Sequence, residues 1–527
     1  MRFFNTAGPV DCREHYCIPP LERLDLEDVL MLLQQKKYFV LHAPRQTGKT
    51  SCLLALLDYL NAEGQYRCVY INVEAAQAAR EDVGAAMHAM LSELAARAKT
   101  MLDDPFVETV WAEVLAKNGP YGALNGVLTE WSAHDPKPLI LLIDEIDSLV
   151  GDTLISVLRQ LRAGYDKRPR YFPQSVILCG VRDVRDYRIL AASEKTAITG
   201  GSPFNIKAAS LRLKDFTRSE IETLYRQHTE ETGQIIVPEA LALIWELSEG
   251  QPWLVNVLGY ETCFRRKAGR DRTRPITAEQ VEEAKENLIL RRETHLDQLA
   301  DKLKEERVRR VIEPVLAGDT LAEGFRRDDV DYLVDLGLIK QAIGGAIRIA
   351  NPIYQEVIPR ELGWTIQSGM TEQTAWYVDQ DGRLDIAKLV AAFQEFFREH
   401  SEHWVERFQY KEAGPQLLLQ AFLQRIVNGG GRIEREYGLG RLRTDLLIIW
   451  PYDNQVQKGV IELKVLHKSL EQTLAAGLQQ TWEYMDHCAT DEGHLVIFDR
   501  MPGKSWEEKI YRRQEQAHGK TITVWGM

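Results

Sequence analysis

Short apolar runs alternate with stretches of helical periodicity along the first part of the chain. Four of these runs have the length and apolarity of buried strands. One begins at Tyr38, and the others cover 68–73, 138–143 and 175–180. Helical spacing marks 24–35 and most of 80–133. Strands that alternate with helices predict an α/β fold with a mainly parallel sheet, whose ligand lies at the carboxyl ends of the strands.

From Ser210 onward the pattern turns helical. Thr217 and Glu220 have the spacing of a capping box, as do Thr277 and Gln280, so each pair predicts a helix start. Further on, 328–340 is typical of a helix that is capped at Gly337. A turn at 344–345 and a strand at 346–350 are expected after it.

A change of composition after 363–369 indicates that a new unit begins there. Two helical stretches precede a glycine-rich turn at 428–431. Three further strands are then predicted, followed by a helix that carries Gln480 and Tyr484 on one face. The strands lie at 432–437, 443–450 and 459–465.

The segment that follows the first strand has the composition of a phosphate-binding loop. Gly48, Lys49 and Thr50 form its centre, ahead of the helix that begins near Ser51. A glycine lets backbone N–H groups approach phosphate, the lysine reaches the β and γ oxygens, and the threonine hydroxyl suits Mg²⁺. Ala43 stands where the pattern has its first glycine, and a chance match in a turn is the alternative. The predicted nucleotide-binding residues are Ala43, Pro44, Arg45, Gln46, Thr47, Gly48, Lys49, Thr50, Ser51 and Asp144.

A second acidic element supports ATP chemistry. The apolar run 138–143 ends in Asp144 and Glu145. We expect Asp144 to share the metal with Thr50, and Glu145 to act as the catalytic residue that orients and deprotonates a water aimed at the γ-phosphate. A strand that merely stops at an acidic turn is the alternative.

The first part of the chain resembles the AAA-like ATPases of the signal-transduction and archaeal ATPase group. The resemblance covers about 1–290 and rests on 43–50, 139–147 and the Gly-x-Pro turn at 250–252. It implies a helical lid after the nucleotide-binding core and a γ-phosphate sensor after the fourth strand, for which Arg182 is the candidate. Arg159 and Arg162 are candidate arginine fingers for a neighbouring subunit, although solvated surface arginines look the same. The helix and hairpin near 328–350 resemble a winged helix, for which packing is favoured over DNA binding.

The last predicted strands carry a second candidate site. Asp445 begins one strand, while Glu462 and Lys464 lie two apart on the next and so face the same way. This pattern resembles the PD-(D/E)xK nuclease superfamily over about 372–527. The resemblance implies that Asp445 and Glu462 hold Mg²⁺, that Lys464 stabilises the transition state, and that Gln480 assists. A surface ion pair, or an inactive relic of the fold, is the alternative.

Composition adds limits. The 527 residues are 45% apolar and 27% charged, with a formal net charge of −12, which argues against a protein that coats nucleic acid. The seven scattered cysteines predict a reduced protein without disulfides or zinc. No apolar run approaches the ~20 residues of a membrane span, and no signal-like core occurs at the start, so a cytoplasmic protein is expected.

Together these patterns predict four domains and two activities. The domains are a P-loop ATPase core at 1–209, a helical lid at 210–295, a winged-helix-like connector at 296–365 and a nuclease-like α/β domain at 372–527. The expected function is a Mg²⁺-dependent ATP switch coupled to a Mg²⁺-dependent DNA nuclease, of the kind found in prokaryotic defence or mobile elements, and a homo-oligomer is left open. The alternative is a nucleotide-regulated signalling or DNA-binding ATPase whose C-terminal fold only binds.

Overall fold

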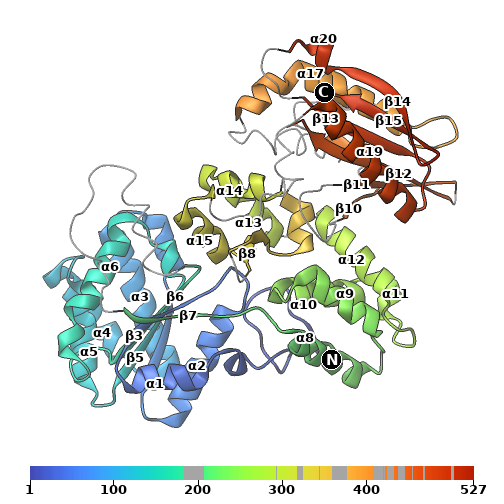
Figure 1. Cartoon of the computed structure of the whole chain (residues 1–527). Helices are drawn as coiled ribbons and strands as arrows, with labels where there is room; N and C mark the ends of the chain where they lie inside the picture. Colours follow the sequence, from blue (N-terminus) through green and yellow to red (C-terminus); the bar gives the residue numbers. More distant parts are fainter. Residues whose placement is uncertain are drawn as a thin grey trace. The chain divides into compact units, whose positions relative to one another are not determined.

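The computed structural model divides the chain into two compact units. The first comprises Met1–Arg291 with Asp331–Leu338, and the second comprises Arg292–Val330 with Ile339–Met527 (Figure 1). The residues described are 1–182, 207–291, 294–316, 324–342, 345–358, 377–407, 419, 422–423, 432–436, 445–453, 455–466, 469–499 and 504–527. The composition change at 363–369 and the turn at 428–431, expected from the sequence, lie outside these residues.

The first unit is built on a five-stranded parallel sheet with the order β4-β5-β6-β3-β7. Its strands are β3 (Tyr38–His42), β4 (Arg67–Asn72), β5 (Leu139–Asp144), β6 (Ser175–Gly180) and β7 (Lys207–Arg212). The four strands expected from the apolar runs are confirmed. Helix α1 (Leu26–Gln34) precedes the sheet, and the helices between its strands are α2 (Lys49–Glu63), α3 (Val83–Leu102), α4 (Phe106–Asn118), α5 (Ala123–His134) and α6 (Gly151–Ala163).

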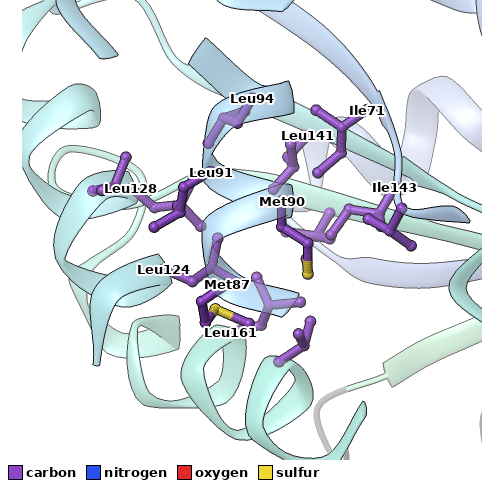
Figure 2. Packing of buried hydrophobic residues seen from close by; sticks show 14 of the residues in the cluster. Ile71, Met87, Met90, Leu91, Leu94, Leu124, Leu128, Leu141, Ile143 and Leu161 are labelled. Atoms are coloured by element: carbon purple, nitrogen blue, oxygen red, sulfur yellow. The ribbon is translucent and has the colours of Figure 1, made fainter. Parts of the chain in front are cut away.

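Successive residues of β3, β4, β5 and β6 enter different cores, because side chains alternate across a sheet. Tyr38 and Val40 join the core formed with α3, α5 and α6, whereas Phe39 and Leu41 join the core formed with α1 and α2. Figure 2 shows residues of β4 and β5 packed against Met90, Leu91 and Leu94 of α3. The second core also contains the thiols Cys52, Cys68 and Cys179.

Helices follow the sheet as the capping signals predict. They are α8 (Arg218–Thr232), α9 (Pro238–Ser248), α10 (Pro252–Tyr260), α11 (Lys267–Arg270) and α12 (Ala278–Arg291). Thr217 and Glu220 form the expected capping box, and Thr277 and Gln280 exchange the same two bonds. Phe216 N–H donates to the Gly250 carbonyl over 2.8 Å, which ties the start of these helices to the Gly-x-Pro turn.

The amino-terminal segment contradicts one expectation from the sequence. Its short strands β1 (Phe3–Phe4) and β2 (His15–Tyr16) pair in parallel, and Cys12 and Cys17 form a disulfide. The prediction of a chain without disulfides is therefore wrong. A turn in which His15 N–H donates to the Asp11 carbonyl brings the two cysteines within 5.4 Å between Cα atoms, within disulfide range.

The second unit starts with helices α13 (Thr294–Lys302) and α14 (Glu306–Leu316) and with the first turn of α15 (Arg327–Asp335). Strands β8 (Ile339–Gln341) and β9 (Ile347–Ile349) then form an antiparallel hairpin, as the sequence suggests. Val330–Asp331, where the chain passes between the units, lies inside α15.

The rest of the second unit is a six-stranded mixed sheet with the order β10-β11-β12-β13-β15-β14. The strands are β10 (Arg432–Glu436), β11 (Asp445–Tyr452), β12 (Gln455–Val465), β13 (Gly493–Phe498), β14 (Tyr511–Ala517) and β15 (Lys520–Gly526). One core lies against α17 (Ile386–Arg407) and another against α19 (Leu470–His487). A short helix, α20, covers Trp506–Lys509. Among the described helices, none combines the length and apolarity that a membrane crossing requires.

Candidate nucleotide and nuclease sites

Two residues of the loop between β3 and α2 adopt a left-handed backbone conformation. They are Gln46, with φ 56°, and Gly48, with φ 91°. Ala43 is buried and is not one of them, so the missing first glycine does not stop the loop from forming. Arg45 and Gln46 are exposed on the outer side of the loop, whereas Thr47 is buried and its hydroxyl donates to the Pro44 carbonyl over 2.8 Å.

Lys49 folds back over this loop. Its buried Nζ donates to the carbonyl oxygens of Ala43, at 3.0 Å, and Pro44, at 2.9 Å. Both acceptors are neutral carbonyls that phosphate oxygens can replace. The lysine begins α2, so the unpaired N–H groups and the positive dipole end of that helix face the same loop. The geometry therefore suits an anionic phosphate chain.

Thr50 and Asp144 meet at the carboxyl edge of the sheet. Thr50 Oγ1 donates to Asp144 Oδ2 over 2.7 Å, and Tyr70 in β4 donates to the same oxygen over 3.0 Å. Asp144 is fully buried. A hydroxyl beside a carboxylate is the donor set that Mg²⁺ prefers, so these residues fit the cation expected with ATP.

Glu145 follows in a left-handed conformation, with φ 56°. Burial raises the pKa of its carboxyl, and the neighbouring charges of Asp147 and Asp144 act in the same direction, while Lys49 opposes them. A carboxylate with a raised pKa is a better proton acceptor for an attacking water. The electrostatics thus suit the role that the sequence predicts for Glu145.

The Gly-x-Pro turn is fixed by a close approach. A side chain at Gly250, whose φ is 84°, would lie 2.0 Å from the Phe216 carbonyl oxygen. The Gln251 side chain then caps α10 by accepting from Leu254 N–H over 2.6 Å. Glycine and glutamine therefore have separate tasks in this turn, and Pro252 takes the first position of α10, where no N–H is needed.

A cavity of about 120 Å³ lies between the phosphate loop, the amino-terminal segment and α10. Ser51 connects two of its walls, because its hydroxyl accepts from Val10 N–H over 3.0 Å. Trp253 connects α10 to the amino-terminal segment, since its indole N–H donates to the Thr6 carbonyl over 3.0 Å. Its position beside Gly48 makes it the candidate place for the nucleoside. The lining includes Asn5, Thr6, Tyr16, Ile18, Arg23, Gln46, Gly48, Pro252, Trp253 and Asn256.

The candidate arginines lie in different surroundings. Arg182 is 8% exposed, and its guanidinium lies over the ring of Tyr332, 4.7 Å from the centroid. Arg159 and Arg162 are exposed on α6, and Arg159 borders a separate hollow with Asn125. That Arg159 and Arg162 act as arginine fingers in a neighbouring subunit stays a prediction.

The strand register of the second unit brings the predicted nuclease positions together. Asp445 in β11 is the direct antiparallel partner of Glu462 in β12. Glu462 is fully buried, and Lys464 Nζ lies 2.5 Å from its Oε1. The side chain of Asp445 lies outside the described part of the structure.

Gln480 lies on α19, one turn before Tyr484, which is buried in the core between α19 and the sheet. Gln480 is half-buried, with its Oε1 shielded from solvent. Among the side chains that the structure describes, no three of the types His, Cys, Asp and Glu gather as a ready metal cage.

The parallel sheet and its loop define a nucleotide-binding P-loop ATPase-like protein. The sequence model of a family described as an AAA-like domain matches residues 20–355. The chain belongs to that family. No curated protein matches the chain.

Solved structures of other ATPases are similar at low identity. The Walker-type ATPase PABY2304 of Pyrococcus abyssi has 16% identity and a TM-score of 0.45, covering 67% of this chain and 99% of its own. The Holliday-junction branch-migration motor RuvB of Thermotoga maritima has 15% identity and a TM-score of 0.34, over 64% and 96%. Cdc6p of Pyrobaculum aerophilum has 15% identity and a TM-score of 0.35, over 65% and 93%. With TM-scores below 0.5, these likenesses add nothing to the family match.

Three contributors to the nucleotide site were not predicted from the sequence. Tyr70 binds Asp144, and its signal is a tyrosine inside a buried strand, where the hydroxyl needs a partner. Arg23 donates to the Lys214 carbonyl over 2.8 Å and lies over the Phe216 ring, joining the loop region to the helices. The segment around Asn5 lines the cavity, and no periodicity marks it.

Lys49→Ala is expected to abolish ATP binding, because the ammonium that reaches the β and γ oxygens is lost. Calorimetric titration of the folded variant measures this, with Lys37→Ala, outside the loop, as the matched control. An unchanged ATP affinity in Lys49→Ala would contradict the site.

Glu145→Gln is expected to bind ATP and hydrolyse it slowly, since Asp144 and Thr50 remain while the base is lost. Because the pKa of Glu145 is raised, hydrolysis by the parent protein should fall, as pH drops, at a higher pH than an ordinary glutamate would give. Steady-state ATPase rates across pH test this. The residual ATPase activity of Glu145→Gln should not show this fall at low pH. If the rates of both proteins fall at the same pH, Glu145 is not the base.

Proposed function

We propose that this chain is an ATP-dependent switch whose P-loop ATPase controls a Mg²⁺-dependent DNA nuclease in residues 372–527. The observation that carries the nuclease half is the register that pairs Asp445 with Glu462. Directly opposed residues of an antiparallel pair have Cβ atoms about 4.5–5.5 Å apart on one face. Two acidic positions therefore share one spot on the sheet.

The charge arrangement at this spot supports the proposal. Lys464 follows Glu462 by two positions in β12 and so lies on the same face, with its ammonium in contact with the buried carboxylate. Mg²⁺, when bound, would polarise the phosphate and lower the pKa of an attacking water. Asp445 and Glu462 would hold that cation, and Lys464 would turn its ammonium toward the phosphate charge that develops in the transition state.

The strand that carries Glu462 and Lys464 is buried against a core on each face of the sheet. Leu463 and Ile461 alternate with the polar pair and enter the core against α17, while Val460 enters the core against α19. Catalytic groups need to be held within about 0.5 Å, which strands buried on both faces provide better than loops. This burial supports a working site.

The hairpin region contributes packing to the proposed switch. Asp329 of α15 is 9% exposed, and Arg307 Nε of α14 lies 3.4 Å from its Oδ1. The exposed carboxylates of Asp328 and Asp331 on the same helix repel DNA phosphates, so we assign β8 and β9 with their helices to a connector and place DNA binding in the C-terminal domain.

A second function is favoured by one observation. Glu462 is fully buried and already paired with Lys464, which a purely structural ion pair would also be. In that case the C-terminal fold binds nucleic acid or a partner without cleaving it, and the ATPase regulates that binding.

Cleavage of linear and circular DNA by the purified full chain, in Mg²⁺ or Mn²⁺, separates the two functions. Glu462→Gln keeps the shape of the side chain and should reduce cleavage by orders of magnitude, because losing a metal ligand costs several kcal/mol of barrier. Glu471→Ala, an exposed carboxylate at the start of α19, is the matched control. DNA affinity should change little in either variant.

Coupling is tested with the two ATPase variants. Glu145→Gln held with ATP and Lys49→Ala held in the nucleotide-free state are expected to differ in DNA cleavage at equal protein and Mg²⁺. Equal rates in both variants and the parent, at every ATP concentration, would mean that the domains act independently. Cleavage by Glu462→Gln at the parent rate would refute the assigned nuclease site.

A further inference from the structure

Residues Asp331–Leu338 belong to the first unit and comprise the last five residues of α15 and the three that follow it; we call them the return segment. They pack beside the carboxyl end of β3, which precedes the phosphate loop, and beside that of β7. The Asp335 carboxylate lies 3.7 Å from His42 Nδ1, at the end of β3, and 4.0 Å from Arg212 Nη1, at the end of β7. Arg212 also donates to the Val334 carbonyl over 2.8 Å.

The cap of α15 touches the phosphate loop itself. Gly337 has φ 74°, and a Cβ built on it would lie 2.7 Å from Cγ of Pro44. Gly337 N–H donates to the Val334 carbonyl over 3.0 Å, so the helix ends against the loop. Lys49 donates to the carbonyl of that same Pro44. The return segment therefore contacts a residue that a bound phosphate chain would disturb.

Tyr332 makes the contact with the most direct chemical consequence. Its ring faces the guanidinium of Arg182, which lies two residues beyond the end of β6. The backbone there is anchored, because Val181 N–H donates to Asp147 Oδ1 over 2.9 Å. His42 pairs with Gly180 in the sheet, so Arg182 leaves the sheet next to the start of the phosphate loop.

We propose that Tyr332 sets the discrimination between ATP and ADP, by competing with the γ-phosphate for Arg182. This inference rests on the nucleotide-binding part of the proposed function and is independent of nuclease activity. A guanidinium binds phosphate oxygens through charge-assisted bonds that are stronger than its contact with a ring face. ATP draws Arg182 away from Tyr332, whereas ADP has no γ-phosphate to do so.

The competition also gives nucleotide a route to the second unit. Loss of the Arg182 contact weakens the attachment of the return segment to the first unit. ATP can shift the position of this segment only because ATP, unlike ADP, competes for Arg182. Residues Arg327–Val330 of the same helix belong to the second unit. A change in the return segment is therefore passed on through one continuous helix.

Replacement of the ring tests the competition. Tyr332→Leu keeps an apolar side chain but removes the π face, so ATP should bind about three- to tenfold more tightly than to the parent, with ADP affinity unchanged. Tyr332→Phe keeps the ring and is expected to retain the parent ratio of ATP to ADP affinity. Calorimetry with ADP and a non-hydrolysable ATP analogue, on the full chain, gives both constants.

Two further variants make the test specific. Arg182→Leu should reduce ATP affinity toward that of ADP, and adding Tyr332→Leu to it should change nothing more, because the contested group is gone. Hydrogen exchange of amides 331–338 in the parent should rise with the ATP analogue and not with ADP.

The proposal is overturned if Tyr332→Leu leaves the ratio of ATP to ADP affinity unchanged while melting as the parent does. It is also overturned if exchange of the return segment is the same with both nucleotides. Should Tyr332→Leu fail to fold, the exchange experiment on the parent decides alone. Absence of any nucleotide binding by the parent would instead refute the proposed function.

Discussion

A hydrogen bond of 2.7 Å from Thr50 Oγ1 to Asp144 Oδ2 joins two segments that are 94 residues apart in the chain. It can form because β3 and β5 are parallel and separated only by β6, so their carboxyl ends reach the same edge of the sheet. Lys49, Glu145 and Arg182 follow the same three strand ends. The nucleotide site is thus a consequence of strand direction, and each polar group depends on the apolar strand before it.

The nucleotide site was predictable because its functional residues lie in short contiguous segments. The segment from Ala43 to Ser51 needs only a preceding strand and a following helix, and both show in the apolar pattern. Asp144 ends a strand whose six residues are all buried, and Glu145 follows it directly. In the second unit the separation of Glu462 and Lys464 by two positions was enough to place them on one face. The pairing of Asp445 with Glu462 needed the register, which the sequence does not show.

Features formed by distant segments were not predictable in this way. Tyr332 and Arg182 are 150 positions apart, and neither carries a local signal for the other. The bond between Cys12 and Cys17 depends on a turn at Asp11, while counting cysteines along the chain pointed to free thiols. Asn5 and Thr6 reach the cavity through the pairing of two-residue strands, too short for any periodicity. In each case the tertiary fold, and not local propensity, brings the residues into contact.

The three thiols in the core against α1 and α2 have a practical consequence. Cys52, Cys68 and Cys179 are buried there, and burial raises the pKa of each, that of Cys52 to about 11. A thiol reacts as its thiolate, so these groups are silent toward alkylating reagents while the sheet stays covered. The remaining free thiols, Cys263 and Cys488, are buried as well. The alkylation rate of Cys52, which lies beside the phosphate loop, therefore reports how often the core between the sheet and helices α1 and α2 opens to solvent.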